Sequence, residues 1–285
     1  MGWAKINEIL CILSENMNIV VCIKQVPDVP TIRVDRQRMT IIREGVESII
    51  NPMDFVALEA ALELRGKQGG QVTVITMGPP QSEAALREAL AVGADRAVLL
   101  TDLAFAGADT LATSHVLATA ISKFDPFPDL VLCGVQTIDS DTGHVGPQIS
   151  EELDIPQVCG IIEIHGEGES LTVKRLSDGF LDTLKVSLPA LLAVTTGLCP
   201  VRELPLGALE SAFTQKDIVT WGIEDLGLKE EEVGLSGSAT RVLKLLPPPL
   251  KRGGEMVSGS PQSQVDVLIR KLETLSIIDE ESPKG

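Results

Sequence analysis

The first half of the chain alternates between apolar, β-branched runs and longer stretches with helical periodicity. Such runs are typical of strands that are covered on both faces of a parallel sheet. The helical stretches begin with capping residues or proline and end near glycine. This alternation predicts an α/β fold with a mostly parallel, doubly wound sheet and helices on both faces. The predicted strands are 18–26, 71–77, 96–100 and 128–134, and the predicted helices are 51–70, 79–95, 107–124 and 146–153.

The pattern changes from about residue 158, where short strands and turns follow one another up to residue 195 and predict an added antiparallel segment. Residues 31–44 also alternate, which predicts a hairpin near the edge of the sheet. A Gly-, Ser- and Pro-rich stretch ends in an isolated amphipathic helix at 265–278, which favours a C-terminal arm that docks on something other than its own core. The predicted divisions are an N-terminal extension (1–16), an α/β domain (17–225) and the arm (226–285).

Composition changes this picture mainly through what it excludes. The 285 residues carry a net charge of −16 at pH 7, whereas nucleic acids and anionic membranes are bound through clustered Lys and Arg. No apolar run approaches the roughly 20 residues of a membrane span, and the N-terminus is a poor signal peptide. The five cysteines show no C-x-x-C spacing. We therefore expect a cytoplasmic protein with reduced thiols, without disulfides, metal, nucleic acid or membrane insertion.

Three predicted strands end in sequences that would bring backbone close to a ligand. They end near Cys22–Lys24, at Met77–Gly78 and at Cys133–Gly134. Ligands of doubly wound sheets bind outside the carboxyl ends of the strands, where the strand order reverses. The third strand continues into the loop "GVQTIDSDTGHVGP" (134–147), whose turns and following helix start offer backbone N–H groups to a phosphate. The loop therefore predicts a nucleotide site.

Two carboxylates in this loop leave alternatives open. Asp139 and Asp141 would repel a phosphate, so they brace the turn, accept from ribose hydroxyls or base amines, or are ordinary turn residues. Thr142 and the amides around it are the better phosphate contacts. A D-x-D phosphotransferase needs its first Asp at the tip of the strand, whereas five residues separate Cys133 from Asp139.

A second helix start, "GADTLATS" (107–114), offers hydroxyl groups. Asp109 is expected to cap this helix, and Thr110 and Thr113 either fill its surface or suit a second phosphate or a ribityl chain. No motif of a catalytic nucleophile, P-loop or zinc protease occurs, and the histidines are far apart in sequence. We therefore expect no catalytic residue and no metal ligand.

Several of these stretches together resemble the β (small) subunit of an electron-transfer flavoprotein. They are "MNIVVCIKQVPD", "INPMDFVALEAALEL", "VTVITMGPPQSEAALREALAVGADRAVLLTD", "FAGADTLATS" and "DLVLCGVQTIDSDTGHVGPQISEEL", and the likeness covers about residues 17–280. The resemblance implies an α/β domain of the adenine-nucleotide-binding type and a flavin-carrying α subunit as partner. It also implies a C-terminal arm docked on that subunit and electron exchange with a dehydrogenase.

The resemblance further implies which nucleotide is held. Members with a structural AMP usually show D-x-D-C/S-N-Q-T-G in the loop, whereas bifurcating, FAD-binding members show I-T-M-G-P-P, G-G/A-D-T-x-A-T-S and D-x-D-T-A-Q-V-G-P. This chain is closer to the second type, although "GH" replaces the usual Ala-Gln. The predicted cofactor-binding residues are Cys22, Asn51, Pro52, Asp54, Met77, Gly78, Asp109, Thr110, Thr113, Gly134, Val135, Gln136, Thr137, Ile138, Asp139, Asp141, Thr142, Gly143, His144 and Val145.

A stretch after the antiparallel segment resembles the loop with which family members reach an acyl-CoA dehydrogenase. That loop follows R-x-x-x-L-x-x-I-x-x-A, and "RELPLGALESA" (202–212) fits it. The implied partner-binding residues are Arg202, Leu206 and Leu209, with burial of Leu206 at a helix start as the alternative.

The resulting hypothesis is the β subunit of a bifurcating electron-transfer flavoprotein. Its FAD would accept a hydride from NADH and send electrons in two directions. One direction leads to the flavin of the α subunit and on to an acyl-CoA or related dehydrogenase, the other to a low-potential acceptor such as ferredoxin. A carrier subunit with structural AMP is the alternative within the family, and a nucleotide-sensing binding protein is the alternative from another class.

Overall fold

The computed structural model describes residues 16–28, 33–35, 40–42, 47–167, 170–202, 204, 206–215, 217–243 and 254–278. The chain divides into two compact units, of which the first ends at Leu243 and the second begins at Lys244. Most of the predicted N-terminal extension, residues 1–15, lies outside the described residues. The predicted boundaries of the α/β domain and the arm stay predictions.

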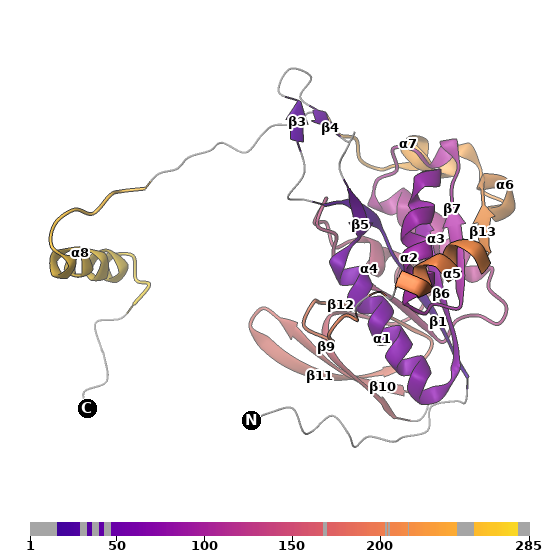
Figure 1. Ribbon diagram of the computed structural model, residues 1–285, viewed down its shortest axis with the longest axis horizontal. Coiled ribbons are helices and arrows are strands. Elements are labelled where there is room, and N and C mark those ends of the chain that lie inside the picture. Colours follow the sequence, from indigo (N-terminus) through magenta and orange to yellow (C-terminus); the bar gives the residue numbers. More distant parts are fainter. Residues whose placement is uncertain are drawn as a thin grey trace. The chain divides into compact units, whose positions relative to one another are not determined.

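The larger unit is built on one nine-stranded sheet in the order β11-β10-β9-β12-β8-β1-β6-β7-β13 (Figure 1). Neighbouring strands from β9 across to β13 pair in parallel, whereas β10 pairs antiparallel with β9 and β11. The predicted mostly parallel sheet with an added antiparallel segment is confirmed. The strands are β1 (Met17–Cys22), β6 (Gly70–Met77), β7 (Arg96–Leu100), β8 (Leu130–Gly134), β9 (Gln157–Glu167), β10 (Ser170–Ser177), β11 (Phe180–Ser187), β12 (Ala190–Val194) and β13 (Ile218–Trp221).

Helices cover both faces of this sheet, and an aliphatic core fills each interface. The first core joins the sheet to α1, α2 and α5, and the second joins it to α3, α4 and the short α6. The α-helices are α1 (Pro52–Gln68), α2 (Glu83–Val92), α3 (Thr110–Ser122), α4 (Val145–Leu153), α5 (Leu206–Gln215), α6 (Ile223–Leu226) and α7 (Gly234–Gly237). The 3-10 helices are η2 (Pro80–Ser82), η3 (Leu103–Phe105) and η4 (Glu230–Glu232).

One part of the sheet prediction was wrong. β12 was expected to continue the antiparallel segment, but it lies parallel between β8 and β9. All five of its residues are buried, as is typical of a strand covered on both faces. The predicted 31–44 hairpin is confirmed as the antiparallel pair of β3 (Arg33–Asp35) and β4 (Thr40–Ile42), which forms a sheet of its own. An unpredicted pair joins β2 (Gln25–Pro27) to β5 (Ser48–Ile50).

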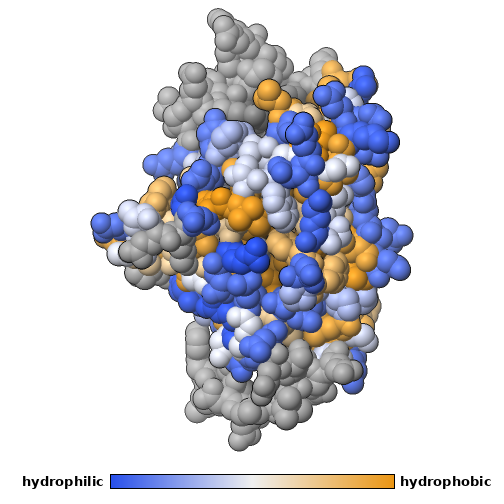
Figure 2. Space-filling model, turned by 90° about the vertical axis from the view of Figure 1, so that its right-hand side faces the viewer, coloured by the Kyte–Doolittle hydropathy of each residue, from blue (hydrophilic) through white to orange (hydrophobic). Residues whose placement is uncertain are grey.

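The second unit contains α8 (Pro261–Thr274), which Ser260 caps by accepting from the N–H of Ser263 (3.3 Å). None of the residues of α8 is buried, and its apolar residues Val265, Leu268 and Ile269 are exposed. Among the described residues, no helix is both long and apolar enough to cross a membrane. The side of the molecule that carries α6 and β13 is largely hydrophilic, with small apolar patches between the polar residues (Figure 2).

Candidate functional site

The candidate site lies where the strand order reverses. The chain passes from β1 to β6 and β7 on one side of β1 and then crosses to β8 on the other side. β1 pairs in parallel with both β6 and β8, so the carboxyl ends of β1 and β8 lie side by side. Ligands of doubly wound sheets bind at this reversal. The loop of residues 135–144, which we call the β8–α4 loop, starts here.

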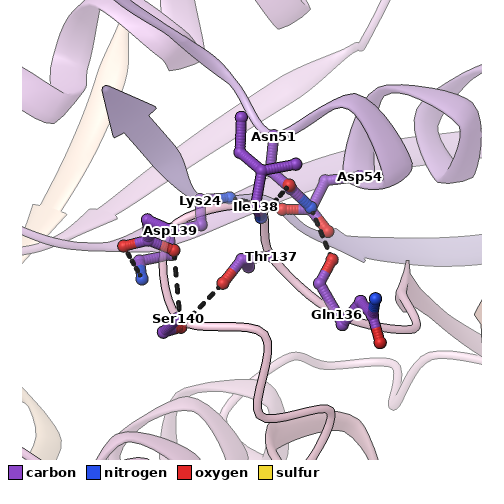
Figure 3. Close-up of polar contacts among 8 residues, drawn as sticks. All are labelled: Lys24, Asn51, Asp54, Gln136, Thr137, Ile138, Asp139 and Ser140. Atoms are coloured by element: carbon purple, nitrogen blue, oxygen red, sulfur yellow. Dashed lines mark hydrogen bonds and ion pairs between the residues drawn. The ribbon is translucent and has the colours of Figure 1, made fainter. Parts of the chain in front are cut away.

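Asn51 holds the β8–α4 loop from the start of α1 (Figure 3). It is fully buried at the N-cap position, yet its side chain makes no capping hydrogen bond to its own helix. Instead, its Nδ2 donates to the carbonyl of Gln136 (2.9 Å), and its Oδ1 accepts from the N–H of Ile138 (3.1 Å). The Asn51 amide thus pairs with the loop as a neighbouring backbone strand would, and it fixes the loop's path.

Asp54, one turn further along α1, ties the two strand ends together. Its Oδ2 accepts from the N–H of Lys24 (2.8 Å), and its Oδ1 accepts from the N–H of Gly134 (2.9 Å). Burial raises the pKa of Asp54 to about 7, although the hydrogen bonds from Gly134 and Lys24 act in the opposite direction. Gly134 allows the approach, because a Cβ at this position would lie 2.5 Å from Oδ1 of Asp54.

Lys24 and Asp139 connect the end of β1 to the tip of the β8–α4 loop. Lys24 Nζ lies 2.6 Å from Asp139 Oδ2 in an ion pair (Figure 3). Burial disfavours the ionised carboxylate, but the hydrogen bonds from Lys24 and Thr137 outweigh it and lower the pKa of Asp139. Asp139 therefore braces the loop, and its charge is balanced by Lys24. Lys24 was not among the predicted site residues, because the sequence placed it inside the predicted strand 18–26.

The start of α4 presents backbone donors beside this brace. His144, the N-cap residue, makes no capping side-chain hydrogen bond, and the preceding Gly143 has a φ of +65°. Among the described residues, the N–H groups of Thr142, Gly143 and His144 have no acceptor. Free N–H groups at a helix N-terminus bind anionic oxygen atoms. This segment therefore has the donor set that a phosphate requires.

The start of α3 lies beside the start of α4, because Ser114 connects them. The Ser114 hydroxyl is fully buried, donates to the carbonyl of Thr110 (2.7 Å) and lies 3.3 Å from the carbonyl oxygen of Val145. Thr110 and Thr113 are therefore brought near the β8–α4 loop. Asp109 caps α3 by accepting from the N–H of Ala112 (3.0 Å), which confirms the predicted cap.

The other predicted residues gather around the second core. Cys22 lies within this core, and Met77, Val135 and Val145 pack against it. Burial raises the pKa of the Cys22 thiol to about 12, so it stays protonated and unreactive at neutral pH. Gly78 follows β6 at the same edge of the sheet. Among the described residues, no group of three His, Cys, Asp or Glu side chains is suited to a metal ion.

The three predicted partner-binding residues have different surroundings. Leu206 is 85% exposed at the first residue of α5, whereas Leu209 packs against the first core. The Nε of Arg202 donates to both carboxylate oxygens of Glu59 (2.9 and 2.8 Å), and its N–H donates to one of them (3.0 Å). The side chain of Glu59 is only 3% exposed, so Arg202 anchors the segment before α5 to α1.

Comparison with known proteins gives the family. A sequence model described as "Electron transfer flavoprotein domain" matches residues 38–226. The electron transfer flavoprotein subunit beta of Thermoanaerobacterium thermosaccharolyticum is 48% identical over 263 residues, which cover 92% of this chain and 100% of that protein. The chain belongs to the electron transfer flavoprotein β-subunit family.

Other members of this β-subunit family carry more specific names. The caffeyl-CoA reductase–Etf complex subunit CarD of Acetobacterium woodii is 45% identical over 264 residues, which cover 92% of this chain and 100% of that protein. Protein FixA of Azorhizobium caulinodans is 46% identical over 266 residues, which cover 90% of this chain and 94% of that protein. Membership in the family brings a flavin or nucleotide cofactor and an α-subunit partner within an electron-transfer complex.

Proposed function

We propose that this β subunit binds FAD at the β8–α4 loop and works in a bifurcating electron-transfer complex. The observation that carries the proposal is the free donor set of Thr142, Gly143 and His144 at the start of α4. It suits the pyrophosphate of a dinucleotide, because the nearby charge of Asp139 is balanced by Lys24. The hydroxyls of Thr110 and Thr113 would suit the ribityl chain or a second phosphate.

When bound, the FAD would accept a hydride from NADH and pass electrons singly to the α-subunit flavin and to a low-potential acceptor such as ferredoxin. The chain's own residues bind and orient this group. Asn51 holds the loop, Asp54 holds the end of β8 from which it starts, and the amides of residues 142–144 would donate hydrogen bonds to the phosphates. The relative CarD is named as a subunit of a caffeyl-CoA reductase–Etf complex, which supports an acyl-CoA or related dehydrogenase as the further partner.

Counting cofactors in the purified heterodimer tests this proposal. We expect two FAD per heterodimer, and Asn51→Leu should reduce the count to one because the loop loses both contacts to Asn51. Leu103→Ala is the control, since Leu103 is 95% exposed and should leave the count at two. One FAD together with AMP in the wild-type complex would support the AMP-holding carrier instead. A complex in which this chain holds no nucleotide would contradict both.

We also propose that Leu206 contacts the dehydrogenase. Leu206→Ala should slow electron transfer to the dehydrogenase by about tenfold, because truncation of an exposed apolar anchor costs roughly 1–2 kcal/mol of binding. Stopped-flow transfer rates measure the effect, with FAD content and thermal stability measured in parallel. The matched control is Leu209→Ala, which should lower the melting temperature because Leu209 packs against the core. Loss of flavin from the Leu206 variant would show that this residue serves the fold.

A further inference from the structure

The chain beyond the family match returns to the connection between β7 and α3. Residues 227–243 lie after the matched range, yet they belong to the larger unit. The N–H of Leu235 donates to the carbonyl of Ala106 (3.0 Å). Gly234 has a φ of +57°, and a Cβ at this position would lie 1.9 Å from the carbonyl oxygen of Ala104. Only glycine fits there, so the returning segment packs against this connection at backbone contact distance.

Asp109 joins the returning segment to the first turn of α3. Its N–H donates to the hydroxyl of Ser238 (2.8 Å), and its Oδ2 accepts from the N–H and the hydroxyl of Thr240 (2.8 and 2.9 Å). Its Oδ1 accepts from the N–H of Ala112 at the start of α3. Burial works against ionisation, but the donors on Ala112 and Thr240 outweigh it and lower the pKa of Asp109. One ionised carboxylate is thus shared between helix and returning segment.

The same helix turn leads on to the β8–α4 loop. Ser114 accounts for this link through its contact with the carbonyl oxygen of Val145, described above, and a second contact of 3.1 Å to Oε1 of Gln148. At the other end, Thr240 lies three residues before Leu243, where the larger unit ends. A series of contacts therefore runs from residues 238–240, which lie within the predicted arm (226–285), through Asp109 and the first turn of α3 to the start of α4.

We propose that Asp109 is a positioning residue that couples the C-terminal arm to the cofactor site. This inference rests on the proposed function, in which the arm docks on the α subunit and the cofactor lies at the starts of α3 and α4. Docking of the arm would restrain residues 238–240 and, through Asp109, the first turn of α3. Coupling between two binding sites is reciprocal. The α subunit should therefore raise the affinity of this chain for the cofactor. The cofactor should raise the affinity of this chain for the α subunit by the same factor.

The double variant Ser238→Ala/Thr240→Val tests the coupling in the heterodimer. It removes the two hydroxyls that contact Asp109 and leaves intact both the cap on Ala112 and the hydrogen bond from the N–H of Thr240. The matched control is Ser122→Ala/Thr214→Val, which removes two hydroxyls that bond only to carbonyls of their own helices. The dissociation constant of the heterodimer is measured with and without saturating FAD, with the α-subunit flavin in place throughout. FAD should tighten the wild type and the control by about fivefold or more, and the double variant by a clearly smaller factor, because two of the three hydrogen bonds to residues 238–240 are lost.

The two possible failures give different results. If Asp109 and its two partners only supported the fold, the double variant would weaken the heterodimer equally with and without FAD. The factor by which FAD tightens the heterodimer would then be the same as in the wild type, and this result would overturn the inference. If no FAD binds to this chain, the proposed function fails, and hydrogen exchange in the heterodimer then tests the positioning role of Asp109 by itself. Faster exchange of residues 110–114 in the double variant than in the control would support this role, and equal exchange would overturn it.

Discussion

Replacing Asp54 with alanine should release the nucleotide from the complex and lower the free energy of unfolding by about 2–4 kcal/mol. The carboxylate is the acceptor for the N–H groups of Lys24 and Gly134 at the strand-order reversal. Each buried donor that loses its acceptor costs about 1–3 kcal/mol. The end of β8, from which the β8–α4 loop starts, would also lose its link to α1. Urea unfolding followed by circular dichroism and the nucleotide content of the purified complex measure the two effects.

Asp54→Asn separates the contact from the charge. It keeps the volume and one acceptor oxygen, so it should retain more stability than the alanine variant. It also removes a group that titrates near neutral pH, because burial raises the pKa of Asp54 from 3.8 to about 7. The folded chain therefore holds a proton that the unfolded chain releases. This contribution to stability is fully present below about pH 4 and is lost as the pH rises toward about 7.

The pH dependence is best measured as the unfolding free energy of the wild type minus that of Asp54→Asn, from about pH 5 to about pH 7.5. This difference should fall with rising pH, with a slope of at most about 1.4 kcal/mol per pH unit. Carboxylates with a lowered pKa, such as Asp139, act in the opposite direction at lower pH, and the subtraction cancels them. A difference that stays flat would mean that Asp54 is ionised throughout and would contradict the prediction.

Arg202→Met should destabilise the chain by about 3 kcal/mol. Among the described residues, the variant leaves the buried Glu59 carboxylate with the backbone N–H of residue 202 as its one remaining donor. Removing one partner of a fully buried ion pair costs about 3–5 kcal/mol, and the lower end applies because the Arg202 side chain is 46% exposed. The shift of the urea midpoint, at constant slope, measures this loss.

The double variant Glu59→Met/Arg202→Met is the matched control. It replaces the whole pair with apolar side chains of similar length, so most of the lost stability should return. Electron transfer to the dehydrogenase is measured on this double variant. A stable double variant with a normal transfer rate would assign Arg202 to anchoring alone, whereas a stable double variant with slow transfer would support its predicted contact with the partner. A double variant as unstable as Arg202→Met would contradict the ion-pair argument.

Much of the fold can be predicted from patterns among residues that are close together in the sequence. The strand–helix alternation predicts the parallel sheet, Pro52 occupies the first turn of α1, and Asp109 caps α3, because each of these depends on residues close together in the chain. The place of β12 depends instead on its pairing with both β8 and β9 in the folded sheet. That choice is tertiary, although the uniformly apolar "ALLAV" was a signal for a strand covered on both faces.

Part of the candidate site can likewise be predicted from local sequence, and part of it depends on contacts between distant segments. Strand ends and glycines can be found in sequence, and so can the β8–α4 loop between them. The pairings that shape this loop cross long stretches of chain, since Asn51 meets residues 136 and 138, and Lys24 meets Asp139. No local pattern predicts that an N-cap asparagine turns away from its own helix. Lys24 was missed for this reason. Ser114 was noted as a hydroxyl at the helix start, but its contact with α4 was not predicted, because it appears only once distant segments are side by side.

Asn51 is the N-cap residue of α1 and Asp54 lies in its first turn, so the spacing between the two residues is fixed by the helix. This fixed spacing restricts where residues can be inserted into the chain. One residue inserted between them would rotate Asp54 by about 100° around the helix axis relative to Asn51. The contact of Asp54 with Gly134 and the contacts of Asn51 with the β8–α4 loop could then no longer form at the same time. Lengthening the chain before β5 leaves their spacing unchanged. Natural or engineered insertions on this side of the fold therefore belong upstream of Ser48, in the region of the β3–β4 pair.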